Sequence, residues 1–204
     1  LPAILQALGC EVIELNCEPN GNFTRGTEPL PENLAELSQM VKKHCADVGF
    51  AIDPDADRLA VVNEKGEPLG EEYTIVLAAD GYLEETNQIE NFVLNLSSSL
   101  ALDKLAESKG SSVVRSAVGE INVVNKMNEV SSNLGGEGNG GVILRECHLG
   151  RDSLVGVTMV LNRMSQSNES LSAIHQSLPQ FVIVKDKVNV KGIDAEDIIK
   201  KVAN

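Results

Sequence analysis

The sequence has no tryptophan, and aromatic residues make up only 3% of its 204 positions. Hydrophobic cores therefore have to be built from Val, Ile, Leu and Ala. A hydrophobic content of 42% excludes a disordered chain. No apolar run approaches the roughly 20 residues that a membrane-spanning helix needs, so we expect no membrane segment. These absences leave a globular protein rich in small aliphatic side chains.

Positive charge is also scarce, since 17 Lys and Arg face 30 Asp and Glu and the net charge is −13. Such a surface repels nucleic acid and anionic membranes, and we expect neither as a partner. Cysteines are few, and none forms a CxxC pair or has zinc-site spacing; they are Cys10, Cys17, Cys45 and Cys147. We interpret them as reduced thiols of a cytoplasmic protein. The chain starts at Leu1 without Met or a signal peptide, which suggests a fragment.

Short apolar runs alternate with amphipathic stretches along the chain, a pattern typical of α/β layers. We expect two small three-layer α/β domains with mixed sheets. The predicted boundaries are residues 1–86 for the first domain, 87–183 for the second, and 184–204 for a linker. Predicted strands are Glu11–Leu15, Val48–Ile52, Leu59–Val62, Phe92–Leu96, Ser112–Arg115, Val142–Leu144 and Phe181–Val190. Predicted helices are Leu1–Leu8, Pro31–Cys45, Glu71–Glu84, Ser99–Ser108, Gly119–Asn128, Asp152–Met164 and Ile193–Val202.

Three aspartates follow the apolar run 48–52 in the segment Asp53–Arg58, which we call the aspartate loop. Asp53, Asp55 and Asp57 alternate, so on an extended chain they point to one side. Such carboxylates repel one another unless a cation lies between them, and Mg²⁺ prefers oxygen ligands. Arg58 can neutralise remaining charge or hold a phosphate with its fork of N–H donors. The loop therefore predicts a Mg²⁺ site next to a phosphate.

Two other kinds of site also carry acidic residues at alternate positions. A calcium EF-hand requires Gly at its sixth position, where this chain has Arg58, and we reject it. A phosphatase of the haloacid dehalogenase type also ends an apolar strand in Asp-x-Asp and uses the first Asp, here Asp53, as nucleophile. That alternative stays open at this point.

A second segment, Gly135–Gly141, reads Gly-Gly-Glu-Gly-Asn-Gly-Gly and is called here the glycine loop. Glycines permit close approach of a ligand to the backbone. Glu137 and Asn139 can accept and donate hydrogen bonds to neighbouring sugar hydroxyls. No Lys follows the glycines, so a nucleotide-phosphate cradle is not expected.

Together the two loops resemble the α-D-phosphohexomutases, the superfamily of phosphoglucomutase, phosphomannomutase and phosphoglucosamine mutase. The aspartate loop is similar to the family's metal loop, and the glycine loop with Gly150-Arg-Asp152 is similar to the sugar-binding region of its third domain. Weaker similarities are Asn20–Phe23 with Glu28–Asn33, and Arg115–Gly119. The resemblance covers nearly the whole chain and corresponds to the family's two central domains.

The resemblance implies an isomerase of carbohydrate metabolism that moves a phosphoryl group between the 1 and 6 positions of a hexose phosphate, through a phosphoserine and a hexose 1,6-bisphosphate. It implies Mg²⁺ held by the three aspartates and a phosphate contact from Arg58. Glu137 and Asn139 would hold the sugar, with Arg115 as a further substrate-binding candidate.

The family's serine loop and its fourth-domain phosphate loop have no counterpart here, so domains 1 and 4 are expected elsewhere on the polypeptide. We expect this chain alone to be inactive, and a non-catalytic sugar- or metal-binding fragment remains a further alternative.

Overall fold

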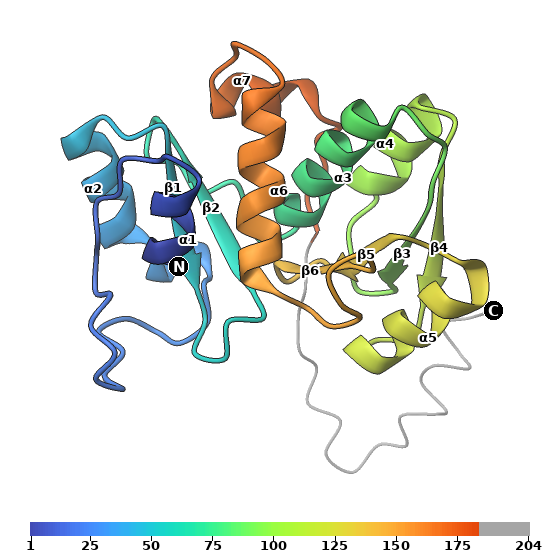
Figure 1. Ribbon diagram of the computed structural model, residues 1–204, viewed down its shortest axis with the longest axis horizontal. Helices are drawn as coiled ribbons and strands as arrows, with labels where there is room; N and C mark the ends of the chain where they lie inside the picture. Colours follow the sequence, from blue (N-terminus) through green and yellow to red (C-terminus); the bar gives the residue numbers. More distant parts are fainter. Residues whose placement is uncertain (184–204) are drawn as a thin grey trace.

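A computed structural model describes residues 1–183. The N-terminal part (blue to cyan in Figure 1) joins two helices, a 3₁₀ turn and a hairpin. In chain order these are α1 (Pro2–Ala7), η1 (Pro31–Asn33), α2 (Ala35–His44), β1 (Val48–Ile52) and β2 (Leu59–Asn63). Strands β1 and β2 pair antiparallel, from Val48 opposite Asn63 to Ile52 opposite Leu59. Helix α2 packs on this pair, because its Val41 joins a small core with Ala60 and Val62.

The C-terminal part is a four-stranded mixed sheet between helices. Its elements are α3 (Tyr73–Thr86), β3 (Asn91–Asn95), α4 (Ala101–Ser108), β4 (Ser112–Ser116), α5 (Glu120–Val130), β5 (Leu134–Glu137), β6 (Gly141–Leu144), α6 (Ser153–Ser165) and α7 (Leu171–Ser177). The strand order is β4-β3-β5-β6. Strand β3 runs parallel to β4 and to β5, and β6 runs antiparallel to β5.

Alternate residues of β3 serve the two faces of this sheet. Phe92 and Leu94 belong to the main core, which contains α3, α4 and α6. Val93 points to the opposite face and packs with Val123 and Met127 of α5. The sheet is therefore the middle of three layers, with α5 below it in Figure 1. This arrangement is the predicted three-layer one.

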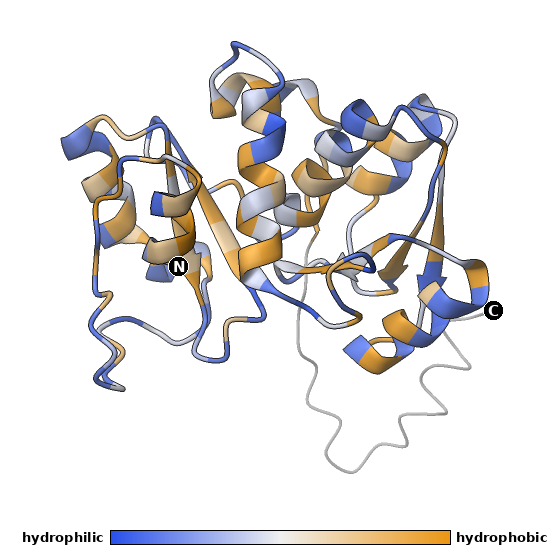
Figure 2. Ribbon diagram, in the orientation of Figure 1, coloured by the Kyte–Doolittle hydropathy of each residue, from blue (hydrophilic) through white to orange (hydrophobic). Residues whose placement is uncertain are grey.

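Strand β2 ties the two parts together. All five of its residues are buried, and the strand is hydrophobic from Leu59 to Val62, in keeping with the orange colour of most of its ribbon in Figure 2. Leu59 and Val61 belong to the main core, whereas Ala60 and Val62 pack toward α2. Helix α3 also lies in the main core, against α6 and α4. The predicted boundary at residues 86 and 87 stays a prediction, and the packing of α3 favours a boundary before that helix.

Some predicted elements differ from those observed. Glu11–Leu15 was predicted as a strand from its alternation, but it forms none. Alternating apolar and polar residues give a strand two different faces, but a strand also needs a hydrogen-bonding neighbour. No described strand pairs with this segment. The first three residues of the predicted strand Phe181–Val190 form no strand, and the rest lies outside the described residues, as does the predicted helix Ile193–Val202. Strand β5 and helix α7 were not predicted. Within residues 1–183, no helix is long and apolar enough to cross a bilayer.

Candidate metal centre and glycine loop

The aspartate loop is a tight turn between β1 and β2 that is organised around one carboxylate. Oδ1 of Asp53 accepts hydrogen bonds from the backbone N–H groups of Asp57 and Arg58, each over 3.1 Å. The turn requires a left-handed residue, and Ala56 takes that conformation with φ +59°. The carbonyl of Ala56 then accepts the N–H of Ser153, the first residue of α6, over 3.0 Å. The loop is thus held at both its ends and its middle.

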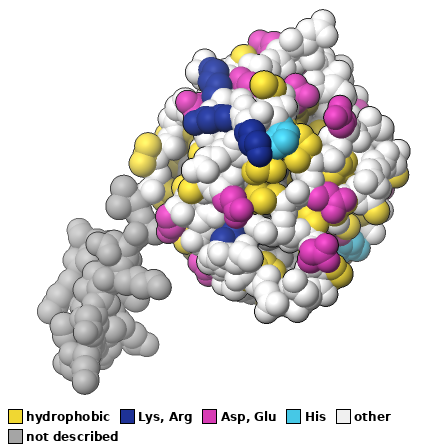
Figure 3. All heavy atoms as spheres, turned by 90° about the vertical axis from the view of Figure 1, so that its left-hand side faces the viewer, with side chains coloured by type: hydrophobic (Ala, Val, Ile, Leu, Met, Phe, Trp, Pro, Cys, Tyr) yellow, Lys and Arg dark blue, Asp and Glu magenta, His cyan; other side chains and the backbone are white. Residues whose placement is uncertain are grey.

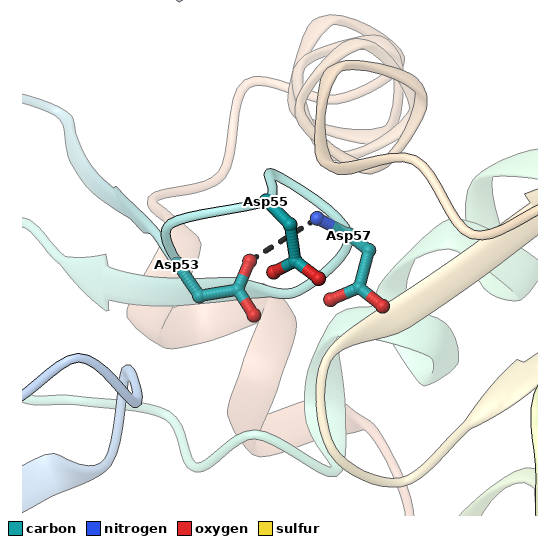
Figure 4. Close-up of side chains that lie close together, drawn as sticks. All are labelled: Asp53, Asp55 and Asp57. Atoms are coloured by element: carbon teal, nitrogen blue, oxygen red, sulfur yellow. Dashed lines mark hydrogen bonds between the residues drawn. The ribbon is translucent and has the colours of Figure 1, made fainter. Parts of the chain in front are cut away.

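The turn brings the three predicted ligands together. One carboxylate oxygen from each of Asp53, Asp55 and Asp57 lies within 4.8 Å of the other two. Figure 4 shows the three carboxylates side by side, with Asp55 between its neighbours. Opposite ligands of Mg²⁺ are about 4.2 Å apart, since each bond is about 2.1 Å long. The trio therefore fits a divalent ion after a small inward movement, with water or substrate oxygens completing the shell.

The pKa values of the two outer aspartates, Asp53 and Asp57, are shifted in opposite directions. Burial by itself raises the pKa of Asp53, but hydrogen bonds from the backbone and side chain of Arg58 outweigh it, and the pKa lies below the ordinary value. Burial raises the pKa of Asp57 to about 6, against the attraction of Arg151 and with the help of the negative neighbours Asp53 and Asp55. Of these two carboxylates, Asp57 is the one whose negative charge is less stabilised.

Arg58 lies against the aspartates. Its Nε is 2.6 Å from Oδ2 of Asp53 and 3.6 Å from Oδ1 of Asp57, and its Nη1 is 3.6 Å from Glu28. The predicted phosphate contact of Arg58 is not tested by these distances. It stays a prediction that requires the guanidinium to turn partly away from Asp53.

The glycine loop is the hairpin between β5 and β6. Glu137 ends β5 with only 3% of its surface exposed. It accepts hydrogen bonds from Asn95 Nδ2 over 2.5 Å and from the Gly119 N–H over 3.1 Å. Asn139 lies at the tip, where its Oδ1 accepts the N–H of Gly141 over 3.2 Å. The Glu137 carboxylate is therefore fixed by Asn95 at the end of β3 and by Gly119 before α5. The Nδ2 of Asn139 lies 3.5 Å from Oε2 of Glu137 and keeps a second N–H for a ligand.

Glycine is required at the tip of this loop. Gly140 has φ +93°, and a Cβ there would collide with the backbone of Leu59 at the start of β2. The N–H of Leu59 donates to the Gly140 carbonyl over 3.0 Å. The aspartate loop and the glycine loop are therefore held next to each other.

One arginine in this contact was not predicted as a site residue. Arg151 follows β6 and donates from Nη1 to Glu137 over 2.5 Å, from Nη2 to Asp57, and from Nε to Glu120 over 3.1 Å. In the resemblance it is only part of the segment Gly150-Arg-Asp152. A signal existed, because Arg151 is one of few basic residues in a chain of net charge −13.

Arg115, a predicted substrate contact, is engaged with the backbone. Its guanidinium donates to the carbonyls of Asn95, Ser98 and Ser99, each over 2.9 Å, and pairs with Asp103. It thereby fixes the turn between β3 and α4. Its contact with substrate stays a prediction.

A separate cavity of about 530 Å³ lies between residues 10–25, α2 and β1. Figure 3 views the molecule from this side and shows hydrophobic side chains exposed among acidic ones. The cavity touches Asp53, Pro54 and Ala56 but not the glycine loop. It is thus distinct from the site where the two loops meet.

Two family models match successive parts of the chain. The model of phosphoglucomutase/phosphomannomutase alpha/beta/alpha domain II matches residues 1–66, and that of alpha/beta/alpha domain III matches residues 70–181. The chain belongs to the phosphoglucomutase/phosphomannomutase family. The family predicted from the two loops is confirmed, and so is the α/β fold class.

Relatives of this family are about twice as long as the chain. A phosphoglucomutase/phosphomannomutase of Thermococcus kodakarensis is 36% identical over all 204 residues, which are 44% of its length. A probable phosphoglucosamine mutase of Methanopyrus kandleri is 33% identical over 92% of this chain and 41% of its own. The crystal structure of a phosphoglucomutase/phosphomannomutase family protein from Burkholderia thailandensis superposes with a TM-score of 0.79, at 28% identity, over 89% of this chain and 40% of that one. The chain thus corresponds to less than half of a phosphohexomutase.

Proposed function

We propose that this chain is the metal- and sugar-binding centre of a phosphohexomutase. The whole protein would move a phosphoryl group between the 1 and 6 positions of a hexose phosphate in the cytoplasm. Its phosphoserine would lie in a domain outside this chain. The observation that carries the proposal is the hydrogen bond between Leu59 and Gly140, because it joins the aspartate loop to the loop that bears Glu137. The names of the relatives support a hexose phosphate as ligand. A hexose 1,6-bisphosphate would follow as the intermediate of the proposed transfer.

Each predicted site residue has a place in this proposal. Asp53, Asp55 and Asp57 would hold Mg²⁺, which when bound stabilises negative charge on a phosphoryl group in transfer. Arg58, at the edge of the trio, would bind the phosphate of the incoming sugar. The carboxylate of Glu137 would accept hydrogen bonds from the sugar hydroxyls.

Asn139 would donate to a hydroxyl from Nδ2, since its Oδ1 is occupied by the Gly141 N–H. Arg115 is the weakest member of the set, because its donors are already taken by three carbonyls and Asp103.

The phosphatase alternative requires Asp53 to attack phosphorus. Oδ1 of Asp53 already accepts two backbone N–H groups and Oδ2 accepts Arg58, and the residue is 2% exposed. Such a carboxylate is a weak and inaccessible nucleophile. The geometry and the family membership both favour the mutase over the phosphatase. A non-catalytic binding fragment remains a fair description of the isolated chain, which we expect not to turn over hexose phosphates.

Titration with Mn²⁺, followed by electron paramagnetic resonance of the free ion, tests the metal centre without requiring activity. We expect weak binding, because small dications keep several waters and rely on substrate oxygens. Asp55→Asn should reduce the affinity at least tenfold. Asp47→Asn is the matched control: it removes the same charge from an exposed position before β1, at the other end of that strand from Asp53. Equal affinities of Asp55→Asn and wild type would overturn the proposed metal site.

A further inference from the structure

The geometry points to Arg151 as a positioning residue that couples the aspartate loop to the glycine loop. It pairs with Asp57 and Glu137 at once. A dication bound by the three aspartates competes with Arg151 for Asp57. Metal binding at the aspartate loop would therefore change the ion pair between Arg151 and Glu137 at the glycine loop. This inference rests on the proposed function and adds a regulation of that site.

The side chain of Arg151 contacts several segments of the chain. Its three guanidinium nitrogens donate to three different carboxylates, those of Asp57, Glu120 and Glu137. Asp57 and Arg151 are 94 positions apart in the chain. The side chain of Arg151 is only 17% exposed. A surface arginine that reached these groups by chance would be more exposed and would not contact three separate elements.

Space for the side chain depends on a glycine. A Cβ on Gly141 would collide with Cδ of Arg151. The backbone N–H of Arg151 donates to Oε2 of Glu120 over 3.2 Å, and Nε donates to the same atom. Main chain and side chain therefore share one acceptor, which fixes the direction of the guanidinium toward Asp57 and Glu137.

Competition for Asp57 follows from its charge and its neighbours. The ion pair with Arg151 stabilises the ionised Asp57 carboxylate. A metal ion at the trio binds the same carboxylate and repels the guanidinium beside it. Occupation of the trio therefore weakens the link from Arg151 to Asp57 and leaves Arg151 to Glu120 and Glu137. The orientation of Glu137, the proposed sugar ligand, becomes sensitive to the metal.

The direction in which Mn²⁺ affinity changes distinguishes competition from a merely structural role of Arg151. Arg151→Gln removes a competing cation, so Mn²⁺ affinity should rise about 3- to 10-fold, the effect of one nearby charge under partial screening. A residue that only held Asp57 in place would give a lower affinity when replaced. Lys126→Gln is the matched control for charge, since Lys126 pairs with Glu129 on the surface of α5. It should change the affinity by less than about twofold.

A second variant has the opposite expected sign. Glu120→Gln removes the carboxylate that shares Arg151 with Asp57, so Arg151 should bind Asp57 more tightly and Mn²⁺ affinity should fall. Glu120 is not a member of the trio. This variant also keeps the test informative if Arg151→Gln does not fold, which circular dichroism and urea unfolding would reveal.

Coupling between the loops is measured with glucose 1-phosphate as the probe, by calorimetry with and without Mn²⁺. In the wild type its affinity should change with Mn²⁺, and by linkage the Mn²⁺ affinity should change by the same factor. In Arg151→Gln that factor should shrink toward one.

An unchanged or lower Mn²⁺ affinity in Arg151→Gln, a raised one in Glu120→Gln, or undiminished coupling in Arg151→Gln would overturn the inference. Failure of the proposed function is distinguishable, since then Asp55→Asn would bind Mn²⁺ as the wild type does.

Discussion

Leu59 and Gly140 are joined by a 3.0 Å hydrogen bond from the Leu59 N–H to the Gly140 carbonyl. Leu59 is the first residue of β2 and follows the aspartate loop, whereas Gly140 is the tip of the glycine loop. The bond needs the two backbones to approach so closely that Gly140 has no room for a side chain. The shape of the site therefore depends on this one glycine.

We expect Gly140→Ala to lower the free energy of unfolding by about 2–5 kcal/mol. Part of this is the cost of a left-handed alanine, about 1–2 kcal/mol, and part is the collision with Leu59. Gly110→Ala is the matched control, because Gly110 has φ +75° but nothing within 4 Å of its added Cβ. Urea unfolding should show only the conformational cost in the control. Equal losses in both variants would mean that the loops separate easily.

Arg115→Lys should destabilise the chain by about 1–3 kcal/mol in urea unfolding, because lysine cannot reproduce the fork that serves three carbonyls. Lys104→Gln removes an exposed ion pair with Glu107 and should leave the urea midpoint almost unchanged. A substrate-binding role without a structural one would give the reverse pattern: unchanged stability and weaker binding of glucose 1-phosphate.

Asp152 is the N-cap of helix α6, and its Oδ1 accepts the N–H of Leu154 over 2.7 Å. Replacing this N-cap with alanine should cost about 1 kcal/mol of unfolding free energy. Asp152→Asn keeps an acceptor in place and should cost less than about half as much. Thermal or urea unfolding of the two variants separates the cap from the ion pair of Asp152 with His148, which both variants lose. A larger loss in the asparagine variant would contradict the capping role.

His175 should make the fold sensitive to mild acid. Its Nε2 is buried with no hydrogen-bond partner among the described residues, and burial lowers its pKa below the ordinary 6.5. The unfolded chain therefore takes up a proton before the folded one. The contribution of His175 to stability is fully present above pH 6.5 and is lost as the pH falls from there through the folded pKa.

His175→Phe keeps a ring against Tyr73, whose centroid is 4.3 Å away, and removes the titrating group. The stability of wild type should drop more steeply than that of the variant below pH 6.5. Urea titrations at a series of pH values measure the difference. Parallel curves would mean that His175 does not titrate differently on folding.

Local patterns in the sequence predicted most of the fold. The apolar run of β1 and the Asp-Pro that ends it fixed a strand followed by a turn, and the predicted helix Asp152–Met164 differs by one residue at each end from α6. Strand β5 was not predicted, because its glycines are typical of a loop. Its conformation is determined by pairing with β3 and β6, which are distant in sequence.

The site was predictable to the extent that its residues are neighbours in the chain. Asp53, Asp55 and Asp57 converge because the turn between β1 and β2 is short. Arg151 was not predicted as a site residue, because its partners Asp57 and Glu137 come near it only in the folded chain. Arg115 lies close to the predicted site, but no local pattern indicates the three carbonyls that occupy its donors, because the turn between β3 and α4 brings them together.

Strand β1 has a hydrogen-bonding neighbour on one side only, namely β2, in the part of the chain that the structure describes. An open strand edge is a template on which another polypeptide can add a strand. The charge of −13 opposes such self-association by mutual repulsion. Salt weakens that repulsion, so concentrated solutions of this chain should stay dispersed at low ionic strength and form larger particles as salt is added.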